Sequence, residues 1–415
     1  MTSNKSIEYS PWLIPDLIQN ILRQSENDER IKVRSVTSKP ATADGDNYMS
    51  DISRVSIEFT RSRTDDGATE MKTLIFKVSL KKDRAACDLA KKFESFETEI
   101  QMMQNTMAKM NEILNENDYR LNARVFHARL EEPSFLVLED LVARGFHLAD
   151  KQTGLDLDHC MLLMRGLAKF HASSIAVYEK DPSCIKRHRK GMYNKECPEE
   201  MQSIFKEAFK ALSVEVKNWP ELDPMYGYSQ KLLQLSEVCI DKGVKCSECR
   251  ENEFNVLNHG DAWINNLMFR YDDEGKVDNQ IFLDFQICSW TCPAFDLVIS
   301  LSSVPNDDVY IHHFDLLVAE YSKTLTNTML RINCETKPPT LSSIRQWMKE
   351  REFLAVLDSV VWKPFTFVDK SEVVDMSDLV TSEGTTSSPG IKDERYRQII
   401  TRRLKDWNSR GLLDI

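Results

Sequence analysis

Three oxygen-bearing side chains in the second half of the chain have the types and spacing that phosphoryl transfer requires. Asp261 follows a His-Gly turn just after an apolar segment, and Asn266 comes five residues later. Asp284 ends the next apolar segment, 23 positions after Asp261. In this chemistry one carboxylate orients the attacking hydroxyl and accepts its proton, while an amide oxygen and a second carboxylate hold Mg²⁺ on the nucleotide phosphates. Any one of these residues alone would be an ordinary cap in a polar turn, but the combination indicates a phosphotransfer site.

The complete strings around these residues are more specific than the three positions alone. Residues 259–266 read HGDAWINN and residues 283–286 read LDFQ. They resemble the HGD-x-x-x-x-N and I/L-D-F motifs of the choline kinase and aminoglycoside phosphotransferase superfamily. In their fuller form they resemble its ecdysteroid kinase-like branch, whose domain is also called CHK kinase-like. A motif of this kind is a hypothesis that its structural context must support.

The resemblance implies a role for each polar residue of these strings. It implies that Asp261 is the catalytic base and that Asn266 and Asp284 are ligands of Mg²⁺. It implies that His259 shapes the catalytic loop. Asp296 resembles the structural Asp that follows in these kinases.

The first half of the chain offers a lysine and a glutamate where a kinase fold needs them. Lys77 is the only charged residue in the apolar run 74–78, and a long helical stretch, residues 83–116, follows it. In the kinase fold such a Lys holds the α- and β-phosphates of ATP and a helix Glu orients it. Glu97 and Glu99 both border the apolar stripe of the stretch, so spacing leaves both open as the partner. The family pattern, in which the Glu precedes an apolar residue, favours Glu99.

Two further strings resemble nucleotide-binding segments of the same branch. GDNYMS resembles a G-[DE]-N-Y-x-S loop that covers the phosphates, which implies phosphate contacts for Gly45, Asn47 and Ser50. FLVLEDL resembles the strand and hinge between the kinase lobes, which implies that adenine bonds to backbone groups of Glu139 and Leu141.

Apolar periodicity indicates which elements position these residues. Alternating patterns predict strands at 52–59 and 73–78, which we expect to pair as an antiparallel hairpin, and two more at 123–130 and 135–138. Helical spacing dominates from Leu155 onward. We therefore expect an α+β, two-lobed, protein-kinase-like fold. A nucleotide-binding lobe, residues 1–140, would hold a small antiparallel sheet with one long helix. A larger helical lobe, residues 141–415, would hold the catalytic and substrate-binding residues, with a helical insert at about 155–250. The polar segment 369–390 is expected to be a mobile loop.

Composition narrows the class of protein. The 415 residues include 41% hydrophobic residues, enough for a packed core, and carry a net charge of −11, which disfavours nucleic acid as a partner. No apolar run approaches the roughly 18 residues of a membrane span, and the N-terminus has no signal-peptide pattern. The ten cysteines are scattered through the chain, as in a reducing compartment. We expect a cytoplasmic protein; the oligomeric state is open.

Three other features favour structural interpretations. Cys246 and Cys249 form a C-x-x-C, but no second pair accompanies it, so unliganded thiols are expected. The basic run 186–190 is expected to be a solvated loop. His171 is expected to be a satisfied core residue.

The function expected from these observations is that of an ATP-dependent kinase with Mg²⁺. It would transfer the γ-phosphoryl group to a hydroxyl of a small, lipophilic acceptor such as an ecdysteroid. Two alternatives stay open: a pseudokinase-type nucleotide-binding protein without transfer, and a kinase for a choline-like or xenobiotic alcohol. A protein kinase is disfavoured because no H-R-D-L-x-x-x-N or A-P-E string is present.

Overall fold

The chain forms two compact units, each with its own core. The first contains residues 1–81 and 123–146, and the second contains residues 82–122 and 147–415. The computed structural model describes residues 15–42, 50–61, 68–80, 85–368 and 390–415.

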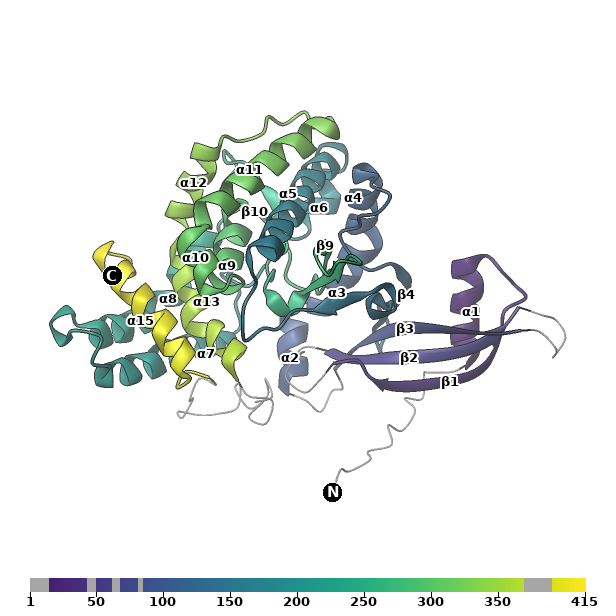
Figure 1. Ribbon diagram of the computed structural model, residues 1–415, viewed down its shortest axis with the longest axis horizontal. Helices are drawn as coiled ribbons and strands as arrows, with labels where there is room; N and C mark the ends of the chain where they lie inside the picture. The colour runs from purple at the N-terminus through teal and green to yellow at the C-terminus, as the bar shows by residue number, and fades with distance from the viewer. Residues whose placement is uncertain (1–14, 43–49, 62–67, 81–84, 369–389) are drawn as a thin grey trace, which may run out of the picture. The chain divides into compact units, whose positions relative to one another are not determined.

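The first unit is built on a five-stranded antiparallel sheet (Figure 1). The predicted hairpin is confirmed: Ile52 lies opposite Lys77, and Val55 lies opposite Leu74. The strands follow the order β1 (Lys32–Pro40), β2 (Ser50–Thr60), β3 (Thr69–Ser79), β5 (Phe135–Glu139) and β4 (Val125–Arg129).

The edge strand β1 was not predicted from the sequence. Its residues read KVRSVTSKP, and only Val36 among them is buried. Edge strands commonly carry charged and polar residues, because one side of the strand faces water. With β1 included, Lys77 lies on the third strand of the sheet, the position that the kinase fold requires.

One helix covers a face of this sheet. The helix α1 (Pro15–Glu26) directs Ile18, Ile21 and Leu22 into a core shared with strand residues such as Ile57 and Phe76. Full burial of a side chain of this kind contributes about 1.5–3 kcal/mol, so α1 and the sheet stabilise each other.

The helical stretch predicted at 83–116 is present but interrupted. Glu94 adopts a left-handed conformation, with φ of 53°, which ends the first helix at that point. A π-helical turn interrupts the stretch again at η1. The elements are α2 (Ala85–Lys92), α3 (Ser95–Gln101), η1 (Met102–Thr106) and α4 (Met107–Leu114), all in the second unit.

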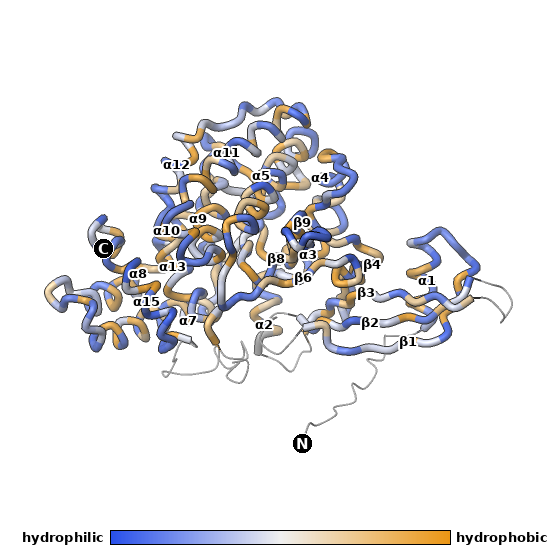
Figure 2. The backbone as a smooth tube through the Cα atoms, in the orientation of Figure 1, coloured by the Kyte–Doolittle hydropathy of each residue, from blue (hydrophilic) through white to orange (hydrophobic). Residues whose placement is uncertain are grey.

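The second unit is mostly helical, and its longest helix, α5 (Leu157–Lys180), packs against α4 and α11 (Figure 1). Every residue of α9 (Ala294–Ser303) and α13 (Phe353–Val361) is buried, and both can be located in Figure 2. No helix in the described part of the chain is long and apolar enough to cross a bilayer. The remaining helices are α6 (Pro182–Lys186), α7 (Glu199–Glu215), α8 (Tyr228–Ser247), α10 (Asp307–His312), α11 (Phe314–Arg331), α12 (Leu341–Glu350) and α15 (Glu394–Ser409).

Short strands within this unit carry the predicted motif. The strand β8 (Leu267–Tyr271) follows Asn266 directly and pairs with β9 (Val277–Phe282) as an antiparallel hairpin. A second antiparallel pair joins β7 (Val256–Asn258) to β10 (Ser289–Thr291). The chain therefore has the α+β organisation predicted from its sequence, with a small antiparallel sheet followed by a mostly helical part.

The strand β6 (Phe146–Leu148) belongs to a three-stranded sheet of the order β6-β8-β9. The short helical turns are η2 (Leu141–Arg144), η3 (Val216–Asn218), η4 (Pro224–Tyr226), η5 (Ile264–Asn266) and η6 (Lys363–Phe367). The segment 369–389 of the predicted mobile loop lies outside the described residues.

Candidate active site

The loop between β7 and β8 brings two of the predicted residues together. Asn266, which is 8% exposed, donates from Nδ2 to Oδ2 of Asp261 at 2.8 Å. The same nitrogen donates to the backbone carbonyl oxygen of Asp261 at 3.0 Å. The turn of η5 therefore fixes the half-buried carboxylate of Asp261 against the amide of Asn266.

Asp284 reaches the same place from the end of β9. The backbone N–H of Leu283 donates to the carbonyl oxygen of Asn266 at 2.9 Å, which ties the two segments together. Asp284 adopts a left-handed conformation, with φ of 64°. Burial, and next the negative charge of Asp284, raise the pKa of the Asp261 carboxyl well above its usual range. The predicted set of Asp261, Asn266 and Asp284 thus lies in one place.

The imidazole of His259 joins the two segments. Its Nε2 donates to the carbonyl oxygen of Leu283 at 2.9 Å, since a carbonyl oxygen can only accept. The other ring nitrogen, Nδ1, then accepts from the backbone N–H of Asp261 at 3.3 Å. The ring is fully buried, and burial lowers its pKa. Because Nδ1 accepts a hydrogen bond and therefore carries no proton, the ring is neutral. His259 therefore positions the loop.

A buried carboxylate anchors the start of the catalytic loop. The backbone N–H groups of His259 and Gly260 donate to Oδ2 and Oδ1 of Asp296 at 2.6 and 2.9 Å. The ring of His171 lies between Asp296 (3.1 Å from Nε2) and the hydroxyl of Tyr321 (2.7 Å from Nδ1). Both ring nitrogens of this buried histidine are thus engaged, as expected of a core residue.

Gly260 permits the turn that precedes Asp261. Its φ is +85°, a conformation that side chains disfavour, and a Cβ at this position would lie 2.3 Å from the carbonyl oxygen of Ile287. The segment after Asp284 therefore packs directly against the catalytic loop.

The donor set fits a hard divalent cation. Asp284 offers carboxylate oxygens. Because Nδ2 of Asn266 is directed at Asp261, the side-chain oxygen of Asn266 points away from Asp261 and is a second oxygen donor. Among the described residues no group of three or more His, Cys, Asp or Glu side chains could hold a metal alone. A cation here would therefore take further oxygens from bound phosphates or water, as Mg²⁺ commonly does.

The first unit carries the residues predicted to bind phosphate. Lys77 is 4% exposed on β3, and Ser50 is 5% exposed at the first position of β2. Gly45 and Asn47 lie outside the described residues.

The predicted hinge follows β5. The backbone N–H of Glu139 donates to the carbonyl oxygen of Arg124 at 2.9 Å, and the buried Leu141 begins η2. Between them Asp140 accepts from the N–H of Val142 at 3.2 Å and from Nε of Arg54 at 2.8 Å. Asp140 therefore fixes the local turn.

Burial distinguishes the two candidate glutamates of α3. Glu99 is 2% exposed, whereas Glu97 is exposed. A fully buried carboxylate needs a charged or hydrogen-bonding partner, and Glu99 is the one of the two that is buried. The role predicted for Glu99 is to orient Lys77. That role remains a prediction.

A second buried polar cluster near the site was not anticipated. Asp358 of α13 is 3% exposed and accepts a hydrogen bond from Oγ of Ser302 at 2.9 Å. The negative charge of Asp358 is a further cause of the raised pKa of Asp261. Lys363 donates from Nζ to the carbonyl oxygen of Ser303 at 2.8 Å. The signal in the sequence was Asp358 itself, the only charged residue in the run FLAVLDSVV.

The sequence profile that the chain matches is that of a family of small-molecule kinases, which are phosphotransferases. The chain matches the sequence profile of the ecdysteroid kinase-like family over residues 44–334, and it belongs to this family. No curated protein matches the chain.

Solved structures similar to the chain are kinases with low sequence identity. The amicoumacin kinase hAmiN in complex with AMP-PNP, Ca²⁺ and Ami is 14% identical, with 94% of this chain and 93% of that chain covered and a TM-score of 0.40. The streptomycin-ATP-APH(2")-IIa ternary complex is 14% identical, with 83% and 98% covered and a TM-score of 0.32. The ADP-bound aminoglycoside phosphotransferase APH(2'')-Ib is 13% identical, with 82% and 98% covered and a TM-score of 0.32.

Proposed function

We propose that this protein is an ATP-dependent kinase that phosphorylates a hydroxyl of a small, lipophilic acceptor such as an ecdysteroid. The observation that carries the proposal is the junction of two segments at one point: Asn266 bonded to Asp261, and His259 bonded to the backbone just before Asp284. Membership of the ecdysteroid kinase-like family supports the class of acceptor.

Asp261 acts on the acceptor in this proposal. The acceptor oxygen forms a bond to the γ-phosphorus, the bond from that phosphorus to the bridging oxygen breaks, ADP leaves, and the hydroxyl proton passes to Asp261. The hydrogen bond from Asn266 holds the carboxylate in one orientation. The raised pKa of Asp261 makes its ionised form a better proton acceptor than an exposed aspartate.

Asp284 and the side-chain oxygen of Asn266 are proposed to hold a divalent cation, Mg²⁺. When bound, such a cation offsets the negative charge that develops on the transferred group. His259 and Asp296 keep the two ligand-bearing segments in register through the hydrogen bonds described above.

The nucleotide-binding residues are proposed from both units. Lys77, oriented by Glu99, would bind the α- and β-phosphates together with Ser50. Backbone groups of Glu139 and Leu141 would bind adenine. We accordingly propose residues 1–140 as the nucleotide-binding lobe and 141–415 as the catalytic and substrate-binding lobe, with the acceptor recognised near the helical insert at about 155–250, in a cytoplasmic protein.

The proposal is tested by measuring nucleotide binding and transfer separately. ATP with Mg²⁺ is titrated calorimetrically, and transfer from γ-labelled ATP is followed with a panel of steroid, choline-like and phenolic alcohols. Asp261→Asn should still bind ATP and should lose transfer by about 10²–10⁴-fold, the usual contribution of a positioned base.

The outcomes separate the three candidate functions. Transfer to a steroid that is lost in Asp261→Asn supports the proposal. Transfer only to choline-like or phenolic alcohols would replace the acceptor class. ATP binding without transfer to any alcohol of the panel would reject the enzyme in favour of a nucleotide-binding protein.

A further inference from the structure

A cavity of about 680 Å³ lies beside the catalytic loop, within the second unit. One wall is residues 286–288, which directly follow Asp284 and Phe285. The carbonyl oxygen of Ile287 in this wall lies against Gly260. Residues 93–98 and 187–196 supply the rest of the lining. The volume suits a small organic ligand.

The lining is basic, although the whole chain carries a net charge of −11. Four cationic side chains face two carboxylates there: Arg187, Arg189, Lys190 and Lys195 against Glu94 and Glu196. Arg189 is exposed and makes no hydrogen bond or ion pair with the residues that the structure describes. The basic run that looked like a plain solvated loop therefore contributes to a concave surface.

The ion pairs that the two lining lysines make are exposed to solvent. Nζ of Lys190 lies 2.6 Å from Glu94, but their side chains are 37% and 52% exposed. Lys195, 80% exposed, lies 3.7 Å from Glu248. Exposed pairs of this kind contribute about 0–1 kcal/mol, so both ammonium groups can turn toward a bound anion at low cost.

A buried amide supplies a second, independent indication of a ligand. Gln286 lines the cavity and is only 6% exposed, and its Nε2 has no acceptor among the described residues. A buried donor without an acceptor costs about 1–3 kcal/mol. A ligand oxygen within reach of this amide would recover that cost.

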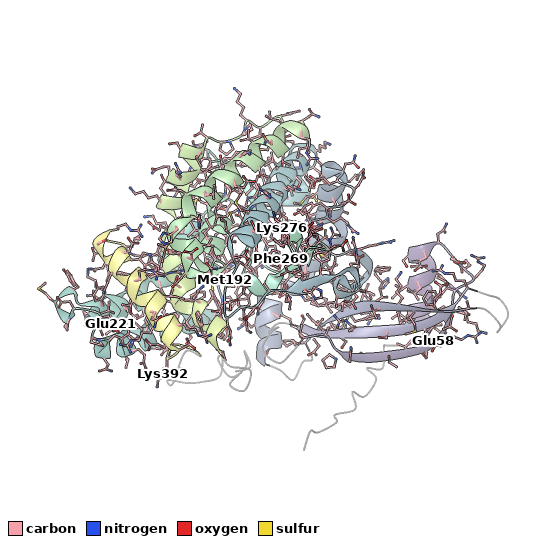
Figure 3. The ribbon with its side chains drawn as sticks, in the orientation of Figure 1. Glu58, Met192, Glu221, Phe269, Lys276 and Lys392 are labelled. Atoms are coloured by element: carbon pink, nitrogen blue, oxygen red, sulfur yellow. The ribbon has the colours of Figure 1, made fainter. Side chains whose placement is uncertain are left out.

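The loop that carries the cations is held in place. The carbonyl oxygen of His188 accepts from the N–H of Trp290 at 2.7 Å. Nε2 of the His188 ring lies 3.2 Å from the hydroxyl of Thr106. Gly191, with φ of +58°, packs closely on Ser289. Met192, labelled in Figure 3, marks this loop. Because the loop is already held by these contacts, less conformational entropy is lost when a ligand binds to it.

We propose that this cavity is an accessory binding site for a small ligand that carries a tetrahedral oxyanion, a phosphate or a sulfate. Arg189 and Lys190 supply charged donors, and Gln286 supplies a neutral donor. A guanidinium group binds such an oxyanion through two parallel hydrogen bonds, and a tetrahedral anion has oxygens enough for donors arriving from several directions. None of the lining residues is one that we propose to bind the nucleotide or the cation or to accept the proton, and the existence of the site does not depend on the proposed function.

Calorimetric titration of the full chain without nucleotide tests the site, with inorganic phosphate, inorganic sulfate and glycerol phosphate as probes. Arg189→Ala should weaken binding at least tenfold, and because this side chain is exposed the variant should fold normally. Gln286→Leu, similar in volume, should also weaken binding. Arg345→Ala is the matched control: it removes one cation from the exposed face of α12 and should change affinity less than twofold.

Each result is decisive. Equal affinity for free phosphate and the ester identifies the free anion as ligand, and tighter binding of glycerol phosphate identifies an organic phosphomonoester; both support the site. An absence of binding overturns it. So does equal weakening in Arg189→Ala and Arg345→Ala, which would indicate only general electrostatic attraction. Binding that Arg189→Ala leaves unchanged would place the anion elsewhere and also overturns it.

Discussion

The substitution Asp296→Asn tests whether one buried carboxylate holds the catalytic loop in place. Asp296 is 1% exposed and accepts from three donors: the backbone N–H groups of His259 and Gly260, and Nε2 of His171. Asparagine has nearly the same shape, but one of its two side-chain positions becomes an NH₂ group. In either orientation of the amide, at least one buried backbone N–H then faces another donor.

The magnitude follows from the bonds that are lost. A hydrogen bond to a charged group contributes about 1.5–3 kcal/mol, and the bonds that remain lose their charge assistance. We expect the free energy of unfolding to fall by about 2–4 kcal/mol. Transfer should also fall by about 10²-fold, because a displacement of about 1 Å at a catalytic group costs that much.

Urea unfolding monitored by tryptophan fluorescence measures the stability change, with Trp263 and Trp290 as probes in the surrounding segments. The comparison variant is Asp261→Asn, and its unfolding is measured in buffer that contains a metal chelator. Because burial and the charge of Asp284 disfavour the ionised form of Asp261, removing that charge should leave stability equal to or above the wild type. An unchanged midpoint for Asp296→Asn, or an equal loss for both variants, would refute the reasoning.

Two further predictions concern the surroundings of the loop. Gly260→Ala should destabilise the protein by about 2–5 kcal/mol in urea unfolding, because the new Cβ would meet the carbonyl oxygen of Ile287 at 2.3 Å. Gly275→Ala, with a similar φ of +79° but nothing within 4 Å, should lose only about 1–2 kcal/mol, and equal losses would contradict the steric argument. Burial, assisted by the charge of Arg187, lowers the pKa of His188 from 6.5 to about 4. The unfolded chain therefore binds the proton more readily between these values, and stability should fall as the pH drops from 6.5 to 4, by up to about 3 kcal/mol. His188→Gln should lose this part of the pH dependence. If the free energy of unfolding changed with pH by the same slope in both proteins, His188 would not be its source.

Local patterns predicted much of the fold and the central part of the candidate site. The alternation in residues 52–59 and 73–78 predicted the hairpin of β2 and β3, because a strand with one buried face must alternate. The spacing of Asp261, Asn266 and Asp284 reflects a turn followed by a hairpin, which brings residues close in sequence close in space. These features depend on near neighbours, and a sequence records near neighbours directly.

Patterns failed where burial depends on distant segments. The strand β1 has a polar sequence because it lies at the edge of the sheet, and its pairing with β2 is seen only in the tertiary structure. The helical stretch that looked continuous breaks at Glu94, which periodicity alone does not reveal.

The sequence by itself determined the class of chemistry, through the types and spacing of its polar residues, and the α+β organisation that carries them. The tertiary structure alone decided that Glu99 is buried and Glu97 exposed, that Asp296 holds the loop through His259, and that a basic run lines a cavity with Gln286. The physical reason is that burial and local charge are set by whatever packs against a residue. In this chain those neighbours come from positions tens to more than a hundred residues away.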